Sequence, residues 1–200
     1  MTIYLVRHGL AAAGVDDLDP GLAELGHEQA RAAAKGLIGV TGARLVVSPL
    51  RRTRETAAPI AEALGVTPEI REEVAEVFDP SMPSEQRTAM IGPFMAGRWA
   101  DQPEVLRAWR ARVVDALLTM GLESAAAGSD LVIVSHYIAI GVAIGEATGD
   151  DRVVPAPIAN CSITTMEVGH GKFTLLEAAA TGHLAANLVG GAQSATLGRG

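Results

Sequence analysis

Three short apolar segments, each predicted to be a buried strand, are followed directly by polar side chains that could bind an anion. These residues are Arg7, His8 and Gly9 after residues 3–6, Ser48 with Arg51, Arg52 and Arg54 after residues 43–47, and Ser135 and His136 after residues 131–134. Ligands of parallel α/β sheets bind at the carboxyl ends of the strands, so we expect these residues to converge. Arginine offers a planar fork of donors that matches phosphate oxygens, and a helix that follows a strand adds backbone donors at its N-terminus. The spacing therefore predicts a phosphate-type anion site.

Strands and helices alternate along the chain, and this order positions the polar residues. Runs rich in β-branched residues and leucine predict strands, and longer alanine-rich or amphipathic runs predict helices. The predicted strands cover residues 3–6, 43–47, 131–134, 162–168 and 173–178, and the predicted helices cover residues 22–37, 48–64, 104–122 and 138–147. Ser48 is a good N-cap and Pro49 a good first helical residue. The expected fold class is a three-layer α/β/α architecture with a mostly parallel central sheet and an antiparallel edge hairpin around residues 169–172.

The length of 200 residues predicts one domain, which we place at residues 1–186. Three prolines lie within residues 79–102, and Pro103 follows directly. This proline-rich segment is predicted to be an insertion that lies over the site like a cap. Phe94, Met95 and Trp99 are expected to pack this segment onto the body, and Arg98 is either a second anion contact or surface charge. Residues 187–200 are rich in glycine, alanine and serine and predict a flexible tail.

The composition limits the partners of the chain. Sixteen lysines and arginines against 23 aspartates and glutamates give a net charge of −7, which disfavours binding to nucleic acid or to an anionic membrane. The longest apolar stretch, residues 131–145, is too short to span a bilayer, and the N-terminus lacks the basic residues of a signal peptide. A single cysteine, Cys161, predicts neither a disulfide nor a cysteine-rich metal site. We expect a cytoplasmic protein, either a monomer or a homodimer.

The order of these motifs resembles that of the histidine phosphatase superfamily, whose fold is also called phosphoglycerate mutase-like. The matching segments are Arg7-His8-Gly9 after the first strand, residues 22–30 (LAELGHEQA), residues 48–57 (SPLRRTRETA), residues 132–136 (VIVSH) and residues 160–164 (NCSIT). Together they cover about residues 1–178 in the order found in the family. The resemblance implies the same fold and a phosphatase, with no cofactor and no metal, that acts on a small phosphorylated molecule or a phosphoprotein.

The resemblance also implies a role for each matching position. His8 matches the nucleophile that becomes phosphohistidine, and His136 matches the second histidine of the pocket. Arg7 and Arg52 match the arginines that hold the phosphoryl oxygens, while Gly9 and Ser48 complete the expected substrate contacts. Arg51 falls on a position that varies in the family and is expected to lie at the surface.

The general acid is expected among four glutamates at residues 69–76. Aligning the family pattern from residues 64–66 without gaps places Glu76 on the acidic position, and Glu76 has apolar neighbours, as a carboxyl group in a partly dry pocket would. Glu72 is the alternative, although Glu72 and Glu73 lie in a charged run that is most simply solvated.

Three other functions are considered. A phosphoglycerate mutase-type phosphotransferase is disfavoured because residues 10–13 lack the threonine and asparagine that mutases usually carry there, and because the acidic residues Asp16, Asp17 and Asp19 lie nearby. A catalytically silent phosphate-binding regulatory module would be expected to lack one of the main site residues. All of them are present in this sequence: Arg7, His8, Arg52, Glu76 and His136. A metal site built from His8, His136 and a carboxylate is disfavoured because two arginines would repel a divalent cation. The metal-independent phosphatase is therefore the leading expectation.

Overall fold

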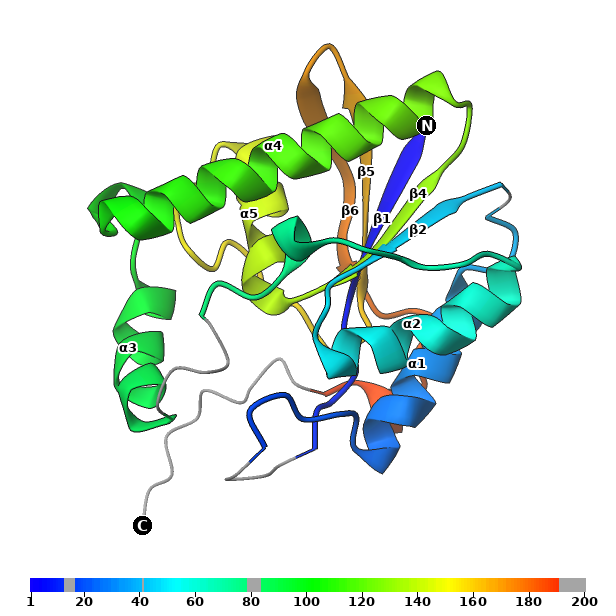
Figure 1. Ribbon diagram of the computed structural model, residues 1–200, viewed down its shortest axis with the longest axis horizontal. Helices are drawn as coiled ribbons and strands as arrows, with labels where there is room; N and C mark the ends of the chain where they lie inside the picture. Colours follow the sequence, from blue (N-terminus) through cyan, green and yellow to red (C-terminus); the bar gives the residue numbers. More distant parts are fainter. Residues whose placement is uncertain (13–16, 41, 79–83, 191–200) are drawn as a thin grey trace.

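The computed structural model describes residues 1–12, 17–40, 42–78 and 84–190 of the 200-residue chain (Figure 1). Six strands form one sheet in the order β3-β2-β4-β1-β5-β6. The strands are β1 (Thr2–Arg7), β2 (Arg44–Val47), β3 (Glu69–Ile70), β4 (Leu131–Ser135), β5 (Ile163–Gly169) and β6 (Lys172–Ala180). β1 to β4 are mutually parallel, whereas β5 runs antiparallel to both β1 and β6. The predicted α/β class with an antiparallel edge hairpin is confirmed.

Five α-helices accompany the sheet in the described part of the chain. They are α1 (Glu24–Gly36), α2 (Arg51–Leu64), α3 (Ser84–Ala96), α4 (Glu104–Ala126) and α5 (Tyr137–Thr148). Short 3-10 turns occupy residues 72–74, 99–101 and 186–188. None of the helices in these described ranges is long and apolar enough to cross a membrane.

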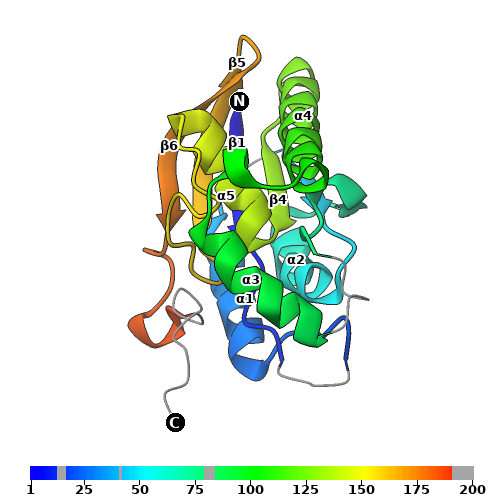
Figure 2. The same cartoon turned by 90° about the vertical axis from the view of Figure 1, so that its left-hand side faces the viewer.

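The sheet is covered on both faces, which explains the continuous apolar sequence of β4. Leu131 and Ile133 pack with side chains from α4 and α5 in one core cluster. Val132 and Val134 point the other way and pack with α1 and α2 in a second cluster. Because a central parallel strand is buried on both sides, it needs apolar residues at every position. Figure 2 shows the β5–β6 hairpin at one side of this layered body.

Helix α2 begins later than the sequence predicts. Its first residue is Arg51, with Leu50 at the N-cap position, so Ser48 and Pro49 belong to the connection from β2. The reason is that the Ser48 hydroxyl hydrogen-bonds to His136 Nε2 at 2.8 Å and is not the helix cap. The Arg51 backbone N–H instead donates to the carboxylate of Asp19, at 2.9 and 3.0 Å. A carboxylate from another segment has replaced the expected local cap.

The inserted segment is anchored by aromatic contacts, as expected for Phe94 and Trp99. The Phe94 ring lies 5.1 Å from Phe78 and 5.6 Å from Trp99, both in edge-to-face geometry, and all three side chains are buried. Arg98 is 60% exposed and pairs with Asp151 at 3.4 Å, so its charge has a partner within the protein. Residues 79–83 of the predicted insertion lie outside the described residues.

The C-terminal segment stays attached to the body beyond the predicted start of the tail at residue 187. Gln29 Nε2 donates to the carbonyl oxygen of Leu188 at 2.8 Å, and the Asn160 backbone N–H donates to Gly190 O at 2.9 Å. Residues 187–190 are therefore held by two long-range hydrogen bonds. The rest of the predicted tail, residues 191–200, lies outside the described residues.

Candidate active site

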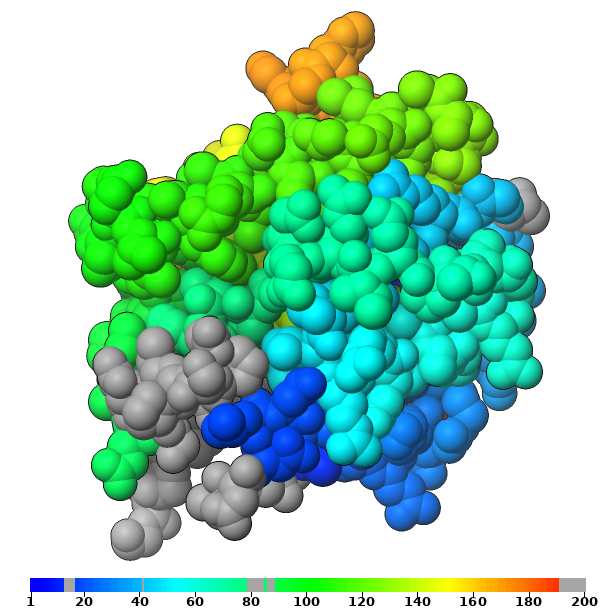
Figure 3. Space-filling model, viewed as in Figure 1, coloured from blue at the N-terminus to red at the C-terminus, as the bar shows by residue number. Residues whose placement is uncertain are grey.

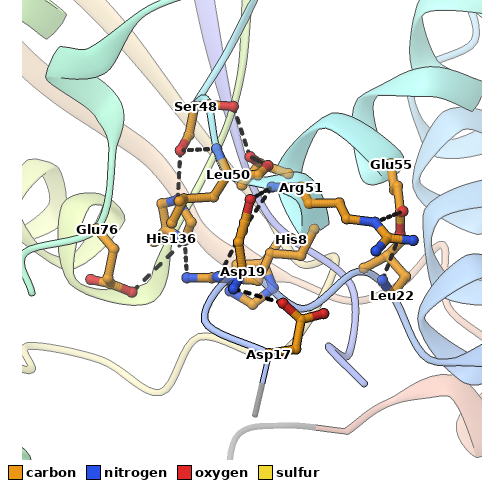
Figure 4. Close-up of polar contacts among 12 residues, drawn as sticks. His8, Asp17, Asp19, Leu22, Ser48, Leu50, Arg51, Glu55, Glu76 and His136 are labelled. Carbon is orange, nitrogen blue, oxygen red and sulfur yellow. Dashed lines mark hydrogen bonds and ion pairs between the residues drawn. The ribbon is translucent and has the colours of Figure 1, made fainter. Parts of the chain in front are cut away.

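Two histidines and two arginines meet at the carboxyl ends of neighbouring strands, where the sequence placed them, and Figure 4 shows the two histidines. The rings of His8 and His136 lie with centroids 5.2 Å apart. Arg52, from the first turn of α2, reaches both rings: its Nε is 3.4 Å from His8 Nε2, and its Nη2 is 3.4 Å from His136 Nδ1. A small pocket therefore holds one guanidinium group between two imidazoles, which suits a tetrahedral anion.

His8 is held in one orientation by its immediate surroundings. Its Nδ1 lies 2.8 Å from the carbonyl oxygen of Gly9, which can only accept, so Nδ1 carries the proton and Nε2 has a free lone pair. Asn160 Nδ2 donates to the carbonyl oxygen of His8 at 2.8 Å, and the His8 backbone N–H donates to Ser135 O at 3.0 Å. Burial, with the charges of Arg52 and Arg7 acting in the same direction, lowers the pKa of His8 to about 3. The His8 ring is therefore neutral, and its unprotonated Nε2 faces Arg52 Nε.

Gly9 holds the start of the loop after β1 against α1 and α2. A Cβ atom on Gly9 would lie 2.5 Å from the carbonyl oxygen of Gly26, closer than packed atoms approach. The Gly9 backbone N–H donates to Thr56 Oγ1 at 3.0 Å, and Thr56 in turn donates to the carbonyl oxygen of Arg52 at 2.7 Å. Thr56 therefore links the backbone of the His8 loop to that of Arg52.

His136 ends β4 and is fully buried. The Ser48 hydroxyl fixes its ring through Nε2 at 2.8 Å, which leaves Nδ1 facing Arg52 and Glu76. Burial is the largest cause that lowers the pKa of His136 well below its usual value, and the neighbouring His8, Arg52 and Arg7 add to it. His136 is therefore a neutral ring whose Nδ1 faces the Arg52 guanidinium.

Arg7, the last residue of β1, is held by the segment that leads into β5. Its Nη1 donates to the carbonyl oxygen of Ile158 at 2.6 Å, and its guanidinium carbon lies 4.9 Å from the ring centre of Tyr137. The Tyr137 hydroxyl donates to the carbonyl oxygen of Ala156 at 3.2 Å. Burial lowers the pKa of Arg7, a shift that Glu76 opposes. A cation stacked on a tyrosine and bound to a carbonyl is fixed before any ligand arrives.

Glu76 is the glutamate of its segment that reaches the pocket. Its Oε2 lies 3.8 Å from His136 Nδ1, while its Oε1 accepts from the Val77 backbone N–H at 2.9 Å. Burial raises the pKa of Glu76, against the lowering effect of Val77, Arg52 and Arg7. Glu72, the alternative, is exposed on the preceding 3-10 turn. The geometry therefore places Glu76, and not Glu72, beside the second histidine.

Four residues beside the site had no assigned role in the sequence. Thr56, Asn160, Tyr137 and Asp19 all act through contacts between segments that are distant in the chain. Thr56 and Asn160 lie in segments that resemble the family, and this resemblance is the sequence feature that could have identified them. Arg51, as expected, lies at the surface, where its Nε pairs with Glu55 at 2.7 Å. Within the described ranges, three or more histidine, cysteine or acidic side chains do not gather in a metal-binding arrangement.

Comparison with known proteins places this geometry in a family. The sequence profile of the histidine phosphatase superfamily (branch 1) matches residues 3–181, whereas no curated protein matches the chain by sequence. Among solved structures, Bacillus stearothermophilus YhfR superposes with a TM-score of 0.76 at 20% identity, covering 91% of this chain and 98% of that chain. The phosphoserine phosphatase of Entamoeba histolytica, in complex with 3-phosphoglyceric acid, gives 0.71 at 20% identity, covering 92% and 99%.

Mycobacterial glucosyl-3-phosphoglycerate phosphatase Rv2419c is similar as well, with a TM-score of 0.64 at 20% identity over 90% of this chain and 99% of that chain. At this level of identity the structural likeness establishes the fold, and the profile match establishes the family. The chain therefore belongs to the histidine phosphatase superfamily, branch 1.

Proposed function

We propose that this protein is a metal-independent phosphatase that hydrolyses a phosphomonoester through a phosphohistidine on His8. One observation carries the proposal: the Gly9 carbonyl oxygen holds the proton of His8 on Nδ1, at 2.8 Å, so that Nε2 presents a lone pair beside Arg52. A nucleophilic histidine needs this tautomer and a neutral ring. The low pKa of His8, about 3, supplies the neutral ring at physiological pH.

In the first step His8 Nε2 attacks phosphorus and the bond from phosphorus to the ester oxygen breaks. Glu76 gives its proton to the departing oxygen, so the alcohol leaves neutral and Glu76 becomes a carboxylate. Its raised pKa supports this role, because the buried carboxyl group keeps its proton to higher pH than an exposed glutamate does. In the second step Glu76 takes a proton from water, the water oxygen attacks phosphorus, and the bond from phosphorus to Nε2 breaks to release phosphate.

The pocket supplies the charge that phosphoryl transfer requires. Arg7 and Arg52 neutralise the phosphoryl oxygens, which carry the negative charge throughout the reaction. The 2.8 Å contact between Ser48 Oγ and His136 Nε2 holds the ring with Nδ1 toward Arg52, where His136 would add a further contact to the phosphoryl group. Because two guanidinium groups hold the oxygens, the mechanism calls on no metal ion.

The substrate is proposed to be a small phosphomonoester or a phosphorylated protein side chain. We propose a cytoplasmic location, and a homodimer is compatible with the proposal. The net charge of −7 disfavours binding to nucleic acid or to an anionic membrane. The similar structures from Entamoeba and mycobacteria bear the names of phosphatases for small phosphorylated metabolites, which favours a small molecule.

The test is hydrolysis of p-nitrophenyl phosphate in excess chelator by the wild type, His8→Ala and His27→Ala. His27 is a surface histidine, with its side chain 47% exposed, and serves as the matched control. We expect activity in the wild type and the control and a loss of at least about a thousandfold in His8→Ala, as for removal of other catalytic nucleophiles. Turnover by folded His8→Ala, or wild-type activity that the chelator abolishes, would remove the proposal.

A further inference from the structure

The first turn of α2 offers two positive features besides Arg52, and carboxylates of the protein itself occupy both. The Arg51 backbone N–H, which is the positive end of the helix, donates to both carboxylate oxygens of Asp19 at 2.9 and 3.0 Å. The Arg51 guanidinium turns to Glu55, with its Nε 2.7 Å from Oε1. These two positions would otherwise attract a second anionic group of a bound molecule.

Asp19 also approaches the arginine of the catalytic pocket. Its Oδ1 lies 3.8 Å from Nη1 of Arg52, whose Nε and Nη2 face the rings of His8 and His136. The Arg52 side chain is 13% exposed and that of Asp19 is 37% exposed. One guanidinium group therefore connects the two histidines to a carboxylate that stays accessible to solvent. Figure 4 shows the contact of Asp19 with Arg51, and Figure 3 shows the loop that carries Asp19, in blue, at the surface against the start of α2.

The charges next to Asp19 reinforce its effect. Asp17 lies beside it, with Oδ1 accepting from the Asp19 backbone N–H at 3.0 Å. Asp17 is exposed, so the rim on this side carries two carboxylates. A molecule whose phosphoryl group sits on Arg52 would bring any second anionic group toward these carboxylates, whereas an ammonium group would be attracted to them.

We infer that Asp19 selects the substrate: it fills the place of a second anionic group, so the site accepts monoesters whose only anion is the phosphoryl group and favours those that carry an ammonium group. The inference rests on the proposed phosphatase function, since it concerns the molecule bound to the same pocket. It requires that the selection depend on the charge of Asp19 and not on its role as a helix cap. Asparagine keeps the cap and removes the charge, so Asp19→Asn separates the two.

The experiment compares O-phosphoethanolamine with phosphoglycolate, two small monoesters that carry an ammonium and a carboxylate group respectively. We expect the wild type to show the higher kcat/KM for phosphoethanolamine. Asp19→Asn should reduce the ratio of the two values by about three- to tenfold, the effect of one charge about 5–6 Å away when solvent screens it almost as strongly as bulk water does. The remote control Asp115→Asn, on the exposed face of α4, should leave the ratio unchanged. High salt should diminish the wild-type preference.

Two results would overturn the inference: a wild-type preference for phosphoglycolate, or equal losses for both compounds in Asp19→Asn, which would show a helix cap only. Calorimetric binding of both compounds to His8→Ala makes the same comparison without turnover. If p-nitrophenyl phosphate is not hydrolysed while binding still depends on the charge of Asp19, the phosphatase proposal fails and the selectivity stands. If hydrolysis depends on His8 but the ratio does not change in Asp19→Asn, the phosphatase proposal stands and the inference about substrate selection fails.

Discussion

The chemistry of single residues depends here on where two protons lie. His8 can attack through Nε2 because the Gly9 carbonyl oxygen holds its proton on Nδ1, and Glu76 can act as an acid because burial raises its pKa. Both the tautomer of His8 and the raised pKa of Glu76 result from their surroundings in the protein, without a bound ligand. The pH dependence follows with a clear sign: His8 stays unprotonated down to about pH 3, whereas Glu76 loses its proton as the pH rises through its raised pKa.

Glu76→Gln should therefore impair substrates with poor leaving groups most. We expect a fall in kcat of about a hundredfold or more for an alkyl phosphate, and a smaller fall for p-nitrophenyl phosphate, whose phenolate leaves without a proton. The wild-type rate with the alkyl phosphate should decline on the alkaline side, and that limb should vanish in Glu76→Gln. Rate profiles for both substrates check this, with Glu72→Gln as control. The same pattern in Glu72→Gln would move the acid to Glu72.

The residues themselves were predictable, and their partners were not. Arg7, His8, Arg52 and His136 were found because strand ends in a parallel sheet converge, which local sequence reveals. Asp19 contacts Arg52 across 33 positions of sequence, and such a contact depends on the final packing of a loop. No local pattern encodes it.

At the scale of elements, the site depends on how closely the loop after β1 approaches α1. The carbonyl oxygen of Leu10 lies where a Cβ atom on Gly26 would be, and Gly9 faces the backbone of Gly26 in the same way. Two glycines thus allow two backbones to meet directly below His8. The sequence predicted α1, α2, α4, α5 and the long strands because their periodicity is local, whereas it placed α3 only within the inserted segment. It missed β3, which has two residues, and it placed the start of α2 too early because Ser48 bonds to His136.

Gly26→Ala should separate the β1 loop from α1. The contact with the Leu10 backbone cannot be relieved by a side-chain rotation, so we expect a loss of about 1–3 kcal/mol in the free energy of unfolding, with reduced kcat/KM because His8 moves. Denaturant unfolding and steady-state kinetics measure the two effects. The control is Gly92→Ala, in α3, where a Cβ atom would meet nothing within 4 Å. Wild-type stability and activity in Gly26→Ala would contradict this account of the contact.

At the scale of the whole molecule, two neutral histidines buried in one pocket make the fold sensitive to acid. The pKa values of both His8 and His136 are lowered in the folded protein, to about 3 for His8. Between about pH 6.5 and 3 the unfolded chain therefore binds protons that the folded chain does not, so stability falls as the pH falls through this window. Glu76, whose pKa is raised, acts in the opposite direction above the usual pKa of a glutamate.

Removing one of these histidines should flatten the acid limb of the stability curve. Each neutral buried histidine contributes a slope of about 1.4 kcal/mol per pH unit in this window. We expect His8→Asn to lose less stability than the wild type between about pH 6.5 and 4.5, measured by urea unfolding. An unchanged slope in His8→Asn would mean that His8 is protonated in the folded protein.

The central claim, a covalent intermediate on His8, is tested most directly by trapping it. The wild type is mixed with p-nitrophenyl phosphate, quenched within one turnover in alkali and digested, and the phosphorylated peptide is identified by mass spectrometry. The account predicts one phosphoryl group on His8, stable in alkali and labile in acid. This group should be absent from His8→Ala and should accumulate when hydrolysis of the phosphohistidine is slowed. Burst-phase turnover with no phosphoryl group on His8, or with one on another residue, would contradict it.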